Sequence, residues 1–170
     1  MFQDEARFGR MSDPRSCWAP VPHRPIVNLA LIREFRYEYA EVSPWDGCLD
    51  LMTTEKMNKE NMTRFLAQVS EAHKREFIVM VLDGASSHKC KGLVIHENVS
   101  LVLLPSYAPE LNPAEQIWNV LRWDYFANEV FDSLDAATAQ AELGLTKIAA
   151  NTSAVRQLTN WPWIIAILKT

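Results

Sequence analysis

The sequence lacks the excess of basic residues that nucleic-acid-binding domains usually carry. It contains 17 lysines and arginines against 21 aspartates and glutamates, which gives a formal net charge of −4. A basic balance would favour nucleic acid as a partner, because clustered Lys and Arg neutralise phosphates. Composition taken alone therefore argues against DNA binding.

A long apolar segment is also missing. The longest apolar run lies near the C-terminus, at residues 161–168, and Pro162 interrupts it. A membrane-spanning helix needs about 20 apolar residues. No signal peptide, with its charged and then apolar segments, opens the chain. We therefore expect a cytoplasmic protein without a membrane partner.

Paired cysteines are absent as well. Cys17, Cys48 and Cys90 are 31 and 42 positions apart, and no C-x-x-C pair occurs. Structural zinc sites take cysteines in pairs two to four residues apart, so the spacing does not predict zinc. Three free thiols are typical of a reducing cytoplasm.

What remains is the composition of one ordinary globular domain. The chain has 170 residues, of which 48% are hydrophobic and 22% charged, values near the average for soluble folded proteins. Period-two and period-3.6 patterns predict α/β architecture with a mixed sheet. The expected elements are a short strand at 1–5, a loop at 7–25, extended chain at 26–42, a returning strand at 48–53, a helix from Asn58, a strand at 77–82 buried on both faces, a strand at 99–104, and helices beyond Asn112 with breaks at Gly144, Asn151 and Pro162.

Three carboxylates stand where chemistry is usually placed. Asp4 is expected at the end of the first strand, Asp83 directly follows the most apolar strand, and Glu115 lies in a helical first turn. Each has an alternative explanation: Asp4 as a solvated acid, Asp83 as a polar strand exit, and Glu115 as the third residue of a capping box that begins at Asn112. Oxygen ligands without His or Cys suit Mg²⁺ or Mn²⁺, and two such ions can clamp a phosphoryl displacement. A glycosidase pair of carboxylates leaves the third acid unexplained.

The residues around these acids resemble three motifs of one family. FQDEARFG at 2–9, VLDGASSH at 81–88 and LPSYAPELNPAEQIW at 104–118 are similar to the acidic motifs of DDE transposases, in the bacterial insertion-sequence branch of the mariner superfamily. The resemblance covers residues 2–127. It implies an RNase H-like fold, a five-stranded mixed sheet flanked by helices. It also implies that Asp4, Asp83 and Glu115 form a catalytic, metal-binding triad for two Mg²⁺ or Mn²⁺ ions.

The resemblance further implies a reaction on DNA. Strands are nicked at element ends, and the liberated 3′-hydroxyl then attacks target DNA, usually at TA. Basic side chains beside the acids are expected to contact phosphates; the candidates are Arg7, Arg10, His88, Lys89 and Lys91. Relatives also carry an N-terminal helix-turn-helix region that reads the element ends. We therefore expect residues 1–170 to be a single catalytic domain that lacks this region.

Several alternatives stay open at this point. The spacing of 31 residues between Asp83 and Glu115 is slightly shorter than in the superfamily. An inactive transposase remnant would carry the same motifs, and another RNase H-like nuclease would cut RNA–DNA hybrids without strand transfer. A homodimer is equally open.

Overall fold

The computed structural model describes residues 1–84, 92–105 and 108–169. Five strands and several helices follow one another along the chain. The elements are β1 (Phe2–Met11), β2 (Leu31–Val42), β3 (Leu49–Thr54), α1 (Lys59–Ala72), β4 (Ile78–Leu82), β5 (Val99–Leu103), the 3₁₀ turn η1 (Pro109–Leu111), α2 (Glu115–Leu121), the π-helical turn η2 (Arg122–Phe126), α3 (Leu134–Ala149), α4 (Thr152–Thr159) and α5 (Pro162–Leu168).

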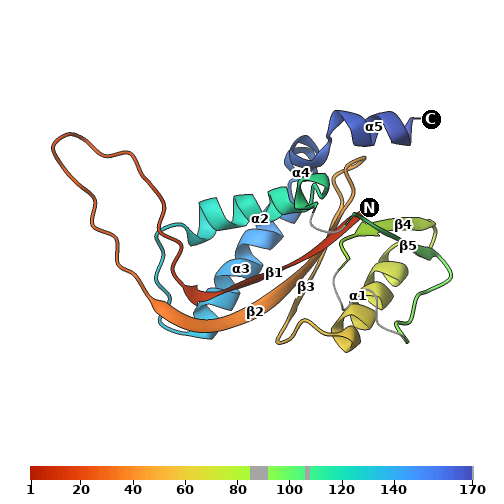
Figure 1. Ribbon diagram of the computed structural model, residues 1–170, viewed down its shortest axis with the longest axis horizontal. Helices are drawn as coiled ribbons and strands as arrows, with labels where there is room; N and C mark the ends of the chain where they lie inside the picture. The colour runs from red at the N-terminus through yellow and green to blue at the C-terminus, as the bar shows by residue number, and fades with distance from the viewer. Residues whose placement is uncertain (85–91, 106–107, 170) are drawn as a thin grey trace.

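The strands form one mixed sheet in the order β3-β2-β1-β4-β5. β1, β2 and β3 run antiparallel to one another, whereas β4 pairs in parallel with both β1 and β5. Figure 1 shows α1 on one side of this sheet and α2 and α3 on the other. Two hydrophobic cores match this division, one under α1 and one under α2 and the helices that follow it. The predicted five-stranded mixed sheet flanked by helices is confirmed.

Helix α1 begins where the sequence predicts it. The Asn58 side chain accepts a hydrogen bond from the Asn61 amide and caps the first turn, which satisfies one of the unpaired N–H groups at a helix start. The apolar residues at helical spacing lie in the core beneath the sheet: Met62, Phe65, Leu66 and Val69.

The first strand is longer than predicted. β1 continues to Met11 instead of ending near residue 5, so Asp4 lies in its first half and Arg7 lies in the strand. The predicted loop begins only at residue 12, and β2 starts at Leu31. A Cβ on Gly9 would lie 1.9 Å from the Glu34 carbonyl oxygen. Gly9, interpreted as a loop residue in the sequence, therefore lies in β1 at a point where the backbone of β2 leaves no room for a Cβ.

The apolar strand β4 is fully covered on one face and only partly on the other, where Val81 packs against the core under α2. Ile78, Met80 and Leu82 are buried, but Val79 is 47% exposed. The prediction of burial on both faces is wrong because a continuous apolar run does not show how far helices reach over each face. Figure 1 shows β4 and β5 at the edge of the sheet, where α1 covers a single side.

The C-terminal breaks fall at two of the three predicted positions. Asn151 caps α4, and Pro162 opens α5. Gly144, however, lies inside α3, which is continuous. A Cβ there would lie 2.5 Å from Leu121 Cδ1, so this glycine allows α3 to pack closely on α2. Within the described chain, no helix is long and apolar enough to cross a membrane.

Candidate active site

Strand pairing brings the first two acidic motifs together. Phe2 pairs with Val81 in the parallel ladder between β1 and β4, and the Val81 amide donates to the Met1 carbonyl at 2.8 Å. Two residues further along both strands, Asp4 and Asp83 stand level. Side chains two positions apart on a strand share a face, so Asp4 lies on the face of Phe2 and Ala6, which packs against α2, whereas Asp83 follows the end of β4 and is exposed.

Asp4 is a nearly buried carboxyl with a defined orientation. Its Oδ2 accepts a hydrogen bond from the Trp118 indole Nε1 at 2.9 Å. Burial, and after it the negative charge of Glu115, raise the pKa of Asp4 to about 7, although the Trp118 hydrogen bond acts in the opposite direction. Glu115 therefore lies close enough to Asp4 for their charges to interact.

Asn112 fixes the start of α2 against β1. Its Nδ2 donates to the carbonyl of Gln3 at 3.0 Å, and its Oδ1 accepts from the Ala114 amide at 3.1 Å. Both bonds are buried, and Gln3 directly precedes Asp4 in β1. The Asn112 side chain thus holds the turn before Glu115 next to the strand that carries Asp4.

The predicted capping box is wrong in one respect. It requires the Glu115 side chain to accept from the Asn112 amide, but that amide donates to the Pro109 carbonyl at 2.9 Å. The 3₁₀ turn η1 satisfies the amide instead. The Glu115 side chain therefore does not accept the hydrogen bond that the predicted capping box assigned to it.

These three acids make a set of hard oxygen donors. The charges of Asp4 in β1 and Glu115 at the start of α2 interact, and the exposed Asp83 directly follows β4, the strand that pairs with β1. Burial is the main cause of the raised pKa of Asp4, and repulsion from the Glu115 carboxylate adds to it. A divalent cation with a preference for oxygen would relieve the repulsion, so the residues fit Mg²⁺ or Mn²⁺.

Of the five basic residues predicted to contact DNA, Arg7 and Arg10 lie among the described residues. Arg10 donates to the Phe131 carbonyl and forms an ion pair with Glu34 at 3.0 Å, so its guanidinium is engaged within the domain. Arg7 is exposed and stacks over the Phe35 ring at 4.9 Å. By strand alternation it shares a face with Gln3 rather than with Asp4. His88, Lys89 and Lys91 lie outside the described residues.

Two residues of this region escaped the sequence interpretation. Trp118 is buried in the core and also donates its indole N–H to Asp4. Arg122 lies seven residues after Glu115, the spacing that returns to the same side of a helix. It stacks over Phe8 at 5.6 Å and lines a cleft of about 240 Å³ together with Arg7 and Gly9. The helical spacing from Glu115 was the available signal for both.

Comparisons with known proteins agree with this geometry. A family model described as "DDE superfamily endonuclease" matches residues 1–137. An uncharacterized protein of Sinorhizobium fredii (strain NBRC 101917 / NGR234), y4pE/y4sA, is 29% identical over 100 residues, which are 58% of this chain and 74% of that protein.

Solved structures of Mos1 transposase share the fold. The paired-end complex with the left transposon end matches with a TM-score of 0.58 at 12% identity, covering 94% of this chain and 55% of the solved chain. The Mos1 mariner paired-end complex with Mn matches with a TM-score of 0.57 at 14% identity, with coverage of 94% and 55%. The chain thus spans about half the length of these transposases. Its sheet and helices have the RNase H-like fold of the transposase catalytic domain, and the chain belongs to the DDE superfamily endonucleases.

Proposed function

We propose that this chain is the catalytic domain of a DDE transposase that cuts DNA strands at element ends and joins the liberated 3′-hydroxyl to target DNA, at TA. Asp4, Asp83 and Glu115 are its metal ligands and catalytic residues. One observation carries the proposal: Glu115 of one motif lies close enough to Asp4 of another to raise its pKa, and the parallel pairing of β1 with β4 brings the motif of Asp83 beside that of Asp4. Membership of the family supports it.

The metal ions would be Mg²⁺ or Mn²⁺, two of them, held by the three carboxylates. Bound divalent ions supply Lewis-acid activation of the attacking oxygen and stabilisation of the leaving oxygen. Trp118 keeps the Asp4 carboxylate in one orientation through its hydrogen bond. Asn112 keeps Glu115 at a fixed distance from the strand. The protein therefore contributes a rigid frame for the acids.

DNA is the proposed substrate and partner. Structures of Mos1 include a paired-end complex with a transposon end and a strand transfer complex. In this chain, Arg122 lies on the helix that Glu115 opens, where a cation would contact phosphates. Recognition of a specific element end would come from a helix-turn-helix region outside residues 1–170. Bound divalent ions reverse the local charge, so the net charge of −4 does not oppose the proposal.

A homodimer is part of the proposal. The loop between β1 and β2 projects from the body of the domain (Figure 1), and it carries the exposed apolar side chains Trp18, Val21 and Ile26. Clustered exposed apolar groups mark interaction sites. Light scattering should give twice the monomer mass for the wild type and the monomer mass for Trp18→Ser; monomers in both samples would refute the dimer.

The test is metal-dependent nicking of supercoiled plasmid DNA by the purified chain. We expect nicking with Mg²⁺ or Mn²⁺ and none with EDTA. Asp4→Asn, Asp83→Asn and Glu115→Gln should each abolish it while retaining the circular dichroism of the wild type. The matched control is Asp132→Asn, an exposed acid outside the three acidic motifs, which should remain active.

Other outcomes would contradict the proposal. Full activity in any of the three variants would remove that acid from the site. Cleavage of RNA–DNA hybrids in preference to duplex DNA would identify a different RNase H-like nuclease. An intact wild-type fold without nicking under any metal condition would identify an inactive remnant.

A further inference from the structure

A second group of metal-ligating side chains lies on the opposite face of the sheet. Cys48 precedes β3, Asp50 lies within β3, and His73 ends α1. One ligand atom from each lies within 4.8 Å of the other two. Asp50 pairs with Glu41, and Glu41 pairs with Gln3, the neighbour of Asp4. Adjacent strand residues face opposite sides, so this group is separate from the carboxylates of the active site.

The distances suit a small tetrahedral ion. His73 Nε2 lies 2.8 Å from Asp50 Oδ2, and Cys48 Sγ lies 4.0 Å from the same oxygen. Zinc bond lengths of about 2.0–2.3 Å place tetrahedral ligands about 3.3–3.6 Å apart. Opening the first distance and closing the second by about 0.5 Å each would meet that geometry. Side-chain adjustments of this size need no backbone movement.

A buried carboxylate faces this group. Glu41 is fully buried, and neither of its carboxylate oxygens has a hydrogen-bond partner. It stands directly opposite Asp50 in the ladder, and its charge interacts first with the positive amino group of Met1 and then with Asp50 and His73. Like charges placed opposite each other on neighbouring strands destabilise a sheet. A dication beside Glu41 and Asp50 would turn this repulsion into attraction.

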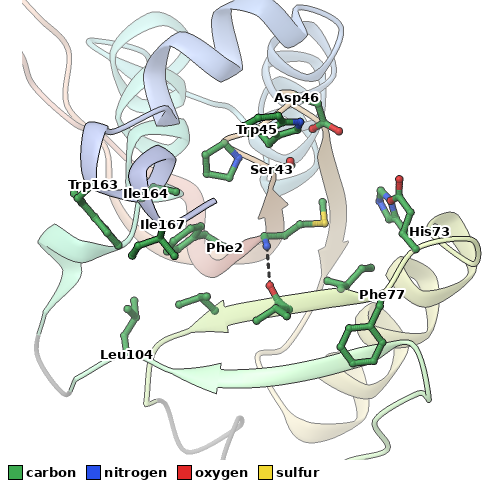
Figure 2. A pocket seen from close by; sticks show the side chains of 16 residues that line it. Phe2, Ser43, Trp45, Asp46, His73, Phe77, Leu104, Trp163, Ile164 and Ile167 are labelled. Carbon is green, nitrogen blue, oxygen red and sulfur yellow. Dashed lines mark hydrogen bonds and ion pairs between the residues drawn. The ribbon is translucent and has the colours of Figure 1, made fainter. Parts of the chain in front are cut away.

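The surroundings of His73 resemble those of metal-binding histidines. Its Nδ1 lies 2.9 Å from Glu76 Oε2. Metal-ligating histidines usually donate the ring N–H that does not face the metal to a carboxylate, which orients the ring. His73 and Glu76 also line a cavity of about 500 Å³. Figure 2 shows His73 and Asp46 among the residues that line this cavity.

We propose that Cys48, Asp50 and His73 bind a Zn²⁺ ion, with Glu41 as the buried carboxylate that faces it. A thiolate and an imidazole favour zinc over Mg²⁺ or Mn²⁺. The ion would join the β2–β3 hairpin to the end of α1 and stabilise the fold. The cysteine spacing did not predict zinc because one carboxylate takes the place of a second cysteine and the third ligand follows 23 residues later, after a helix.

The test is a titration of the metal-stripped full chain with Co²⁺ and Zn²⁺. Co²⁺ should produce the near-ultraviolet charge-transfer absorption of a cobalt–thiolate bond, Zn²⁺ should remove it at one ion per chain, and Mg²⁺ should not. Cys48→Ser should abolish the band, and the matched control Cys17→Ser, an exposed thiol, should retain it. His73→Gln should weaken Zn²⁺ binding by more than the about 10–100-fold that loss of an outer partner causes.

Further variants keep the two metal sites distinguishable. Asp83→Asn should retain Zn²⁺ binding and the cobalt band, since it changes only the active site. Zn²⁺ should raise the unfolding temperature of the wild type and not that of His73→Gln. Absence of the cobalt–thiolate band in the wild type would overturn the proposal, and so would equal Zn²⁺ affinity in the wild type and His73→Gln.

Discussion

The replacement Glu38→Gln should stabilise the domain at alkaline pH and leave it unchanged at acidic pH. Glu38 lies in β2, fully buried, on the face that packs against α3. Its Oε2 accepts a hydrogen bond from Thr53 Oγ1 at 2.7 Å, whereas its Oε1 is buried without a partner. Burial raises the pKa of Glu38 from 4.5 to about 7, and the Thr53 hydrogen bond only partly opposes this.

The size of the effect follows from the pKa. At about 1.4 kcal/mol per pH unit, a pKa of about 7 in place of 4.5 costs the ionised side chain about 3 kcal/mol. Between these values the folded state binds more protons than the unfolded state, so stability falls as pH rises from 4.5 to 7. The full cost applies above pH 7 and none below pH 4.5. Glutamine keeps the shape and accepts from Thr53, but it never ionises.

Urea unfolding at pH 4.5 and pH 8 measures this directly. We expect the free energy of unfolding of Glu38→Gln to equal that of the wild type at pH 4.5 and to exceed it by about 3 kcal/mol at pH 8. Glu97→Gln, at an exposed position, serves as the control and should show no such difference. A gain in stability that is the same at both pH values, or a loss at pH 8, would refute the reasoning.

Two further substitutions test the packing around the site. Trp118→Phe removes the hydrogen bond to Asp4 and should lower the free energy of unfolding in urea by about 1–3 kcal/mol, because a buried oxygen loses its partner. The same variant should nick plasmid DNA more slowly. An unchanged free energy of unfolding together with an unchanged nicking rate would contradict the positioning role of Trp118. Gly144→Ala places a Cβ 2.5 Å from Leu121 Cδ1 and should lower stability by about 1–3 kcal/mol. A stabilised Gly144→Ala variant, as helix propensity alone would predict, would show that α3 can move away from α2.

The sequence predicted the elements whose patterns are local. α1 was predictable from Asn58 and the apolar spacing that follows it, and the order of strands and helices followed from similar patterns. The extent of β1 was not predictable, because Gly9 resembles a turn residue until β2 is seen to pack against it. The partial exposure of β4 depends on how far the helices opposite α1 reach over Val79, which no strand pattern records.

The residues of the candidate site were likewise predictable only in part. Asp4, Asp83 and Glu115 were identified from motifs in which each acid has fixed neighbours. The bond from Trp118 to Asp4 joins residues 114 positions apart, and the bond from Asn112 to Gln3 joins residues 109 apart. Contacts across such separations depend on strand pairing and helix packing together, so a single sequence does not specify them. The group of Cys48, Asp50 and His73 was missed for the same reason.

The central claim is that the carboxylates of Asp4, Asp83 and Glu115 together hold divalent metal, and Mn²⁺ binding followed by electron paramagnetic resonance tests it most directly. The titration compares the wild type with Asp4→Asn, Asp83→Asn, Glu115→Gln and the control Asp132→Asn, all with Zn²⁺ present to saturate any zinc site. The account predicts Mn²⁺ binding by the wild type and the control, and a loss of at least about tenfold in affinity for each of the other three. Equal Mn²⁺ affinity in all five proteins would contradict it.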